Sequence, residues 1–461
     1  MAIDKDLMGA IAVTRFGLGA RGGEIAGARV DPQGYLLSQI SPHGADQPQA
    51  GAPDTVRRLA ALKDYRDTVK TARADGDPKS DPVKMAAVML RDSAGADFLA
   101  RIRLGATTDA GFRERWALFW ANHFTVSAIK LTTAPVVGPF EQEAIRPRVF
   151  GRFEDLLVAA SSHPAMLLYL DQTRSIGPDS VAARRAADAD REAGLNENLA
   201  REIMELHTVG VEAGYSQADV TEFARAMTGW SVGRFEKPEE PGGQFMFRPF
   251  AHEPGARTIM GRQYGEDGQG QALAVMKDLA ANPHTARHLA IKISRHFVAD
   301  DPPPALTARL ERTWLDTGGD LAAVARALVK SPQAWAPEPA KFKTPYEFMV
   351  SAWRASDTVP DDVTKVAPVL NAMGQKAFSA PSPKGWPEEA QAWCAPDAVI
   401  KRMAWSEALA DQAIGQRDPG ELASNALGAR LSPPVAKAIS RAETRSEGLA
   451  ILLMSPEFQR R

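Results

Sequence analysis

The spacing of apolar residues is the feature that most constrains how this chain folds. Through most of its 461 residues, apolar side chains recur three and four positions apart, which is typical of helices with one face on a core. A chain this long exceeds the usual size of a single core. We therefore expect a mainly α, multi-helix globular array of three helical units packed together, residues 1–175, 195–300 and 301–461, with the polar segment 177–194 as a loop.

One stretch departs from the helical spacing. Phe245 and Phe247 alternate, Pro254 and Gly255 form a turn signal, and residues 258–264 suit a returning strand. We expect a small β-hairpin within residues 243–264.

Bulk composition excludes several classes of site. The formal net charge is -2, so no global basic field attracts nucleic acid or anionic membranes. Cys394 is the single cysteine, which leaves no disulfide within the chain and no cysteine-based metal site. A metal would need His, Asp or Glu ligands. No stretch reaches the length of a membrane span.

The first residues carry no secretory pattern. Asp4 and Asp6 stand where a signal peptide needs positive charge, and Arg15 interrupts a short apolar run. We expect a cytoplasmic protein, with export on a partner as the alternative.

The predicted helix at 112–124 directs a histidine inward. Phe112, Trp116, Phe119 and Trp120 share one side with His123. His123 is either a desolvated base or ligand beside a cavity, or a core histidine whose nitrogens bond backbone or Asn122. We include it among the substrate-binding candidates.

A second helix, which Asn196 caps, carries the most distinctive polar face. The members of that face are Asn198, Arg201, Glu202 and Glu205. On a regular helix His207 faces away from it, so these residues do not form a zinc-protease helix. The face is either solvated, with an Arg201–Glu205 pair, or lies in a cleft where two carboxylates bind a divalent cation or share a proton.

Two further helices have clear start signals. Ser216 and Asp219 resemble a capping box, and Asn282 precedes a proline at the first helical position. The helix from 283 carries a basic stripe that suits an anion or an acidic surface, or is simply solvated: His284, His288, Lys292 and Arg295. Arg287 on this helix is a further substrate-binding candidate.

Two isolated residues complete the candidates. His252 lies beside the predicted turn, where core packing does not explain it, and is either a loop site or a turn residue bonded to backbone. Asp171 ends an apolar run and opposes the helix dipole, which calls for an arginine or metal partner or a capping role in the next turn.

Several segments resemble the bacterial family known as domain of unknown function 1800. The likeness rests on residues 15–19, 119–125, 196–210, 219–230, 252–255, 283–298, 385–387 and 455–458, and covers nearly the whole chain. It implies a helical fold and no established activity. Members are often encoded beside an exported phosphatase-like protein, so the resemblance implies a protein partner and a periplasmic setting by co-export.

These observations support two hypotheses. In the first, Glu202, Glu205, His252 and Asp171 converge in a cleft for acid–base or metal-assisted hydrolysis, with Asn198, Arg201, His123 and Arg287 holding the substrate. In the second, the chain is a non-catalytic partner or assembly protein whose polar residues form buried networks that determine the fold.

Overall fold

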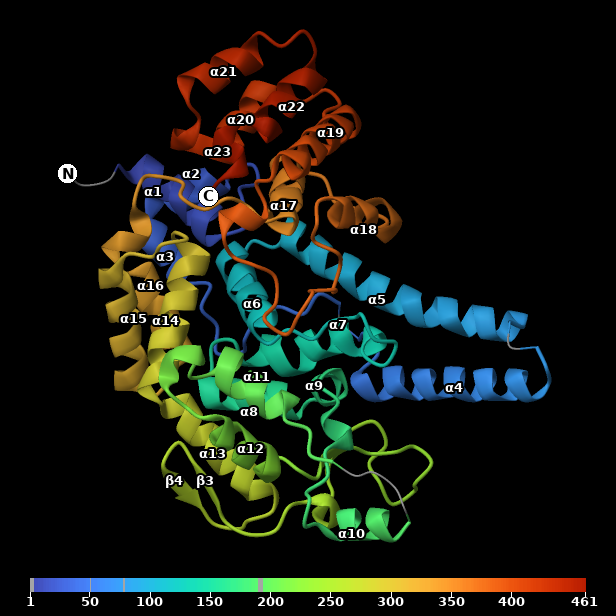
Figure 1. The fold of residues 1–461 in the computed structure, drawn as a ribbon. Coiled ribbons are helices and arrows are strands. Elements are labelled where there is room, and N and C mark those ends of the chain that lie inside the picture. Colours follow the sequence, from blue (N-terminus) through green and yellow to red (C-terminus); the bar gives the residue numbers. More distant parts are fainter. Residues whose placement is uncertain (1–3, 50, 78, 190–193) are drawn as a thin grey trace.

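Helices make up most of the structure, and among the described residues strands occur at only two small places (Figure 1). The computed structural model describes residues 4–49, 51–77, 79–189 and 194–461. The predicted mainly α architecture is confirmed. Within these residues, none of the helices is both long and apolar enough to cross a membrane.

Helix α6 lies near the middle of the molecule, among helices from the N-terminal part of the chain (Figure 1). They are α1 (Lys5–Ile11), α2 (Glu24–Val30), α3 (Pro32–Leu37), α4 (Thr55–Ala74), α5 (Asp81–Thr107), α6 (Gly111–His123), α7 (Val137–Phe140), α8 (Phe153–Ser162), α9 (Pro164–Tyr169) and α10 (Val181–Asp188). The pair α4 and α5 projects from the body of the molecule as a helical hairpin (Figure 1).

Helix α10 corrects the prediction of a loop at 177–194. The hydroxyl of Ser180 accepts a hydrogen bond from the Ala183 amide at 3.1 Å and starts this short helix. Residues 190–193 of the predicted loop, and residues 1–3 of the N-terminal segment, lie outside the described residues.

The middle of the chain contributes α11 (Asn198–Glu202), α12 (Gln217–Ala226), α13 (Gln269–Ala281), α14 (Pro283–Phe297), α15 (Pro304–Thr317) and α16 (Leu321–Val329). Helix α11 continues into a π-helical turn, Ile203–His207, instead of remaining regular. The capping box of Ser216 with Asp219 and the cap at Asn282 are both confirmed.

Strands occur in the region where the sequence predicts a hairpin, but they form two separate pairs. Strand β1 (Trp230–Val232) pairs antiparallel with β2 (Phe245–Phe247). Strand β3 (Arg257–Ile259) pairs antiparallel with β4 (Arg262–Tyr264). Met260 and Gly261 both have positive φ, the conformation of a tight hairpin turn, so the 257–264 segment closes on itself.

The C-terminal helices are α17 (Pro345–Ala355), α18 (Val363–Ala372), α19 (Pro396–Ala413), α20 (Pro419–Leu427), α21 (Pro433–Ser440), α22 (Arg445–Met454) and α23 (Pro456–Gln459). Two apolar clusters form the interior. The larger draws on residues between 11 and 335, and the smaller combines residues 346–458 with Leu18 and part of α5. Helices α6 and α17, together with the loop before α19, meet at the candidate site. The predicted division at 1–175, 195–300 and 301–461 stays a prediction.

Candidate functional site

The predicted polar face at 198–205 lies at the surface of α11. Asn198 is exposed, and Glu202 and Glu205 are half-buried. The interpretation as a solvated face predicts an Arg201–Glu205 pair. In the structure Arg201 pairs with Glu197 instead, at 2.9 Å. Burial, with the charge of Glu205, raises the pKa of Glu202.

His252 and Asp171 each have another partner. The His252 Nδ1 lies 3.0 Å from the carbonyl oxygen of Thr228, a residue between α12 and β1. Among the described residues, no hydrogen bond or ion pair joins His252 to Glu202 or Glu205. Asp171 pairs with Lys130 at 2.8 Å.

Arg287 lies on an exposed part of α14. Its nearest acidic partner is Glu311, at 3.7 Å. Within the described residues, no group of three or more His, Cys, Asp or Glu side chains is placed to hold a metal ion. The convergence of these predicted site residues stays a prediction.

His123 lies in the interior, as its aromatic neighbours indicate. Its ring contacts Trp120 and Phe124, and only 2% of the residue is exposed. Its Nε2 lies 3.2 Å from the His207 carbonyl oxygen, and its Nδ1 lies 3.0 Å from the Lys292 Nζ. Backbone therefore satisfies one ring nitrogen, and a lysine from α14, instead of Asn122, satisfies the other.

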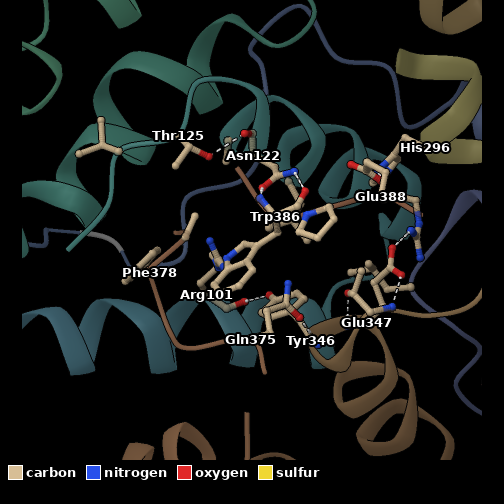
Figure 2. A pocket seen from close by; sticks show the side chains of 18 residues that line it. Arg101, Asn122, Thr125, His296, Tyr346, Glu347, Gln375, Phe378, Trp386 and Glu388 are labelled. Atoms are coloured by element: carbon tan, nitrogen blue, oxygen red, sulfur yellow. Dashed lines mark hydrogen bonds and ion pairs between the residues drawn. The ribbon is translucent and has the colours of Figure 1, made fainter. Parts of the chain in front are cut away.

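A cavity of about 110 Å³ opens where α6, α14, α17 and the loop before α19 meet (Figure 2). Trp386 lies over its centre, with Phe378 at one end and the pair His296 and Glu388 at the other (Figure 2). Arg115 and Tyr346 also line the cavity. The cavity thus combines an aromatic cover with titratable groups, an arrangement common in small-molecule sites.

His296 and Glu388 form a carboxylate–imidazole dyad at the cavity wall. The His296 Nδ1 lies 2.9 and 2.8 Å from the two carboxylate oxygens of Glu388. The His296 Nε2 is buried and has no hydrogen-bond partner in the described part of the chain. A carboxylate that accepts the Nδ1 hydrogen leaves the Nε2 lone pair free to accept a proton.

Burial keeps the histidine of the dyad neutral. Burial lowers the pKa of His296, and the nearby Arg461 and Arg115 add to that effect against the opposing charge of Glu388. Burial disfavours the Glu388 carboxylate, but the charge of His296 when protonated, the hydrogen bond from His296 and the charge of Lys341 outweigh it and lower the pKa of Glu388 to about 2. The pair therefore consists of a neutral base and an ionised carboxylate near pH 7.

Arg115 and Tyr346 supply hydrogen-bond donors to the same cavity. The Arg115 Nε donates to the Gly17 carbonyl oxygen at 2.6 Å, and one of its terminal nitrogens pairs with Glu347. Burial raises the pKa of Tyr346, which keeps its hydroxyl protonated. That hydroxyl makes one long contact, 3.5 Å to the Arg101 carbonyl oxygen. Arg115 has further N–H donors for a bound molecule, whereas the one hydroxyl hydrogen of Tyr346 is engaged in this long contact.

The end of α6 holds the loop that carries Glu388. The Asn122 side chain accepts a hydrogen bond from the Trp386 amide at 2.8 Å and donates to the Trp386 carbonyl oxygen at 3.0 Å. Gly385 has a φ of 84°, and a Cβ there would lie 2.4 Å from the Asn122 carbonyl oxygen. Only glycine allows this close approach, which brings Glu388 to His296.

The candidate residues missed in the sequence lie far apart in the chain. Glu388 follows α14 by about ninety positions, so helical spacing does not connect it to His296. One signal was present. His288, Lys292 and His296 recur every four residues on α14, which places them on one line of the helix. The predicted basic stripe contains His288, Lys292 and Arg295 but not His296.

Comparison with protein-family models finds one match. The model described as "Protein of unknown function (DUF1800)" matches residues 11–460. No curated protein and no solved structure matches the chain.

Proposed function

Since the chain belongs to the DUF1800 family, whose activity is unknown, we propose from the site itself that it is an enzyme of acid–base hydrolysis. His296 is the general base, Glu388 orients it, and the cavity between α6, α14 and α17 takes a small polar substrate. The single observation that carries the proposal is the dyad, whose Nε2 is buried and unpaired among the described residues.

The dyad has the electronic state that a general base requires. A neutral imidazole accepts a proton from a water or hydroxyl group at Nε2 as that oxygen attacks the substrate. The resulting imidazolium is then stabilised by the Glu388 carboxylate on Nδ1. The imidazolium later returns this proton to the leaving group.

Donors across the cavity suit the negative charge that develops on the substrate. Arg115 and Tyr346 line the same cavity as the dyad. Donors fixed in advance in a water-poor site stabilise an oxyanion more strongly than the same donors do in water. The substrate we favour therefore carries a carbonyl or phosphoryl group at the bond that is cleaved.

The test is hydrolysis of p-nitrophenyl acetate and p-nitrophenyl phosphate by the purified chain. We expect His296→Asn and Glu388→Gln to lower kcat/KM by about a hundredfold or more, the usual contribution of a positioned base. His284→Asn is the matched control, because His284 lies on the same helix but is exposed. Absence of turnover above buffer, or a His296→Asn variant as active as the parent, contradicts the proposal.

A second candidate is a non-catalytic partner protein, acting with an exported phosphatase-like protein. One observation favours it: Met85, Val88 and Met89 form an apolar stripe on the projecting helix α5, and each is at least 46% exposed. Co-export would place the chain in the periplasm. The test is whether the chain co-purifies with the phosphatase-like protein. Co-purification that is lost in the double variant Met85→Glu, Met89→Glu, together with no hydrolysis by the chain, favours this candidate over the enzyme.

A further inference from the structure

Four basic side chains meet beneath the end of α6, and we call them the Lys292 cluster: His123, His207, His288 and Lys292. The Lys292 Nζ lies 3.0 Å from the His123 Nδ1. The His288 Nε2 lies 3.3 Å from the Leu206 carbonyl oxygen, and His207 is fully buried beside His123. The π-helical turn Ile203–His207 supplies both the His207 ring and the backbone of the cluster.

Lys292 has an unusual partner for a lysine in a folded protein. Within the described residues it makes no ion pair, whereas Lys341 pairs with Asp300 and Lys130 pairs with Asp171. Its one hydrogen bond is to an imidazole. Because the His123 Nε2 faces a carbonyl oxygen, that nitrogen carries the ring hydrogen and Nδ1 is the acceptor.

The surroundings raise the share of neutral amine at this position. Burial lowers the pKa of Lys292 to about 8; Glu388 and Glu389 oppose this effect, while Lys384 and Arg295 add to it. Its imidazole neighbours are neutral, because burial also lowers the pKa values of His123, His207 and His288. At pH 7 about a tenth of such an amine is unprotonated, against roughly one in three thousand for an ordinary lysine.

We propose that Lys292 is a nucleophilic amine that captures the carbonyl carbon of a small aldehyde or keto acid as an imine. One Nζ hydrogen bonds to the His123 Nδ1 and orients the amine, while the Nζ lone pair forms a bond to the carbonyl carbon. The carbonyl oxygen takes up a proton, the nitrogen loses one, and the carbinolamine expels water to leave a carbon–nitrogen double bond. The amine lies one helical turn from His296 on α14, but the inference does not depend on hydrolysis.

Exposure distinguishes Lys292 from the other desolvated lysine. Lys343 also has a lowered pKa, which burial causes, but only 3% of that residue is exposed, and its ammonium lies 4.0 Å from the centre of the Phe458 ring. Lys292 is only half-buried. Part of the Lys292 side chain is therefore in contact with solvent, whereas almost none of Lys343 is.

The experiment uses glyoxylate with sodium cyanoborohydride on the full chain at pH 7. The imine forms with loss of water, and hydride from the borohydride reduces it to a stable carboxymethyl-lysine that peptide mass spectrometry locates. We expect Lys292 to react at least tenfold faster than Lys130, which is half-exposed and ion-paired, and Lys343 to stay unlabelled. The preference should vanish at pH 10, where ordinary lysines also lose protons.

Variants make the result specific. Lys292→Arg keeps a donor to His123 and should remove the fast-labelled site. Labelling of Lys292 no faster than Lys130 in the parent chain overturns the proposal, and this comparison within one protein stands even where a variant fails to fold. Fast labelling that persists in His296→Asn, a variant designed to lose hydrolysis, separates this inference from the proposed function.

Discussion

At the scale of single residues, His207 shows how far the interior departs from an ordinary core. It is fully buried, its ring centre lies 5.0 Å from that of Phe124, and both ring nitrogens lack partners among the described residues. Burial lowers its pKa to about 3, with help from the charge of Lys292. A buried polar ring without hydrogen bonds costs folding free energy, and the cost rises steeply when the ring is protonated.

This burial predicts a loss of stability in acid. His207 has a pKa of about 3 when folded and 6.5 as its ordinary value, so the unfolded chain binds the proton first as pH falls. The free energy of unfolding is therefore unaffected by this titration above pH 6.5 and falls progressively between pH 6.5 and 3. His288, with a folded pKa of about 4, acts in the same direction.

Each such histidine should remove about 1.4 kcal/mol of unfolding free energy per pH unit below 6.5. Urea unfolding of the parent chain and of His207→Phe between pH 7 and 5 measures this slope. The variant should show a slope shallower by one proton, and His284→Phe, at an exposed position, should leave it unchanged. Parallel slopes for parent and His207→Phe would show that His207 titrates normally.

At the scale of elements, the candidate site depends on how the 385–388 loop attaches to the end of α6. Asn122 makes two hydrogen bonds to the backbone of Trp386, and Gly385 lies against the Asn122 carbonyl. Glu388, three residues further on, reaches His296 from this anchor. A shift of the loop therefore separates the dyad although neither member is changed.

Gly385→Ala tests this attachment. Its φ of 84° strains any side chain, and its Cβ would collide with the Asn122 carbonyl oxygen. Gly374→Ala is a matched control, because Gly374 has a φ of 92° and nothing within 4 Å of its added Cβ.

We expect Gly385→Ala to lose about 1–3 kcal/mol more unfolding free energy than Gly374→Ala, as overpacked sites do, and to lose hydrolysis as well. Chemical denaturation and the p-nitrophenyl ester assay give the two values. Equal effects of the two substitutions would show that backbone strain alone matters and that the loop does not need close contact with α6.

At the scale of the whole molecule, Glu347 on α17 joins distant parts of the chain. It pairs with Arg115 of α6 and with Arg461, whose Nη2 lies 3.1 Å away. All three side chains are at least 90% buried. The charge of Arg115 and then that of Arg461 overcome the effect of burial and hold the pKa of Glu347 well below its ordinary value.

Glu347→Gln should destabilise the fold by about 3–5 kcal/mol, because it leaves two buried guanidinium groups without a counter-charge. The free energy of unfolding in urea measures the effect. Glu407→Gln provides the control, since Glu407 on α19 is exposed, and should change stability by less than about 0.5 kcal/mol. A loss below about 1 kcal/mol for Glu347→Gln would mean that solvent or another group satisfies the two arginines.

The sequence by itself determined the local structure. Apolar spacing identified α6, α12 and α14, and the caps at Ser216 and Asn282 placed two helix starts correctly, because these signals act within one or two turns. The inward direction of His123 followed from the same short-range geometry. The pairing of strands did not, since residues 230–232 lie more than ten positions from their partner strand.

Only the tertiary structure decided which polar groups meet. The predicted face at 198–205 assumes a regular helix. The π-helical turn after Glu202 departs from that geometry and places His207 beside His123. Glu388 reaches His296, and Lys292 reaches His123, across 92 and 169 positions of chain. Spacing along a sequence predicts the face of a helix, but packing between helices determines which faces share a site, and that depends on contacts no local pattern records.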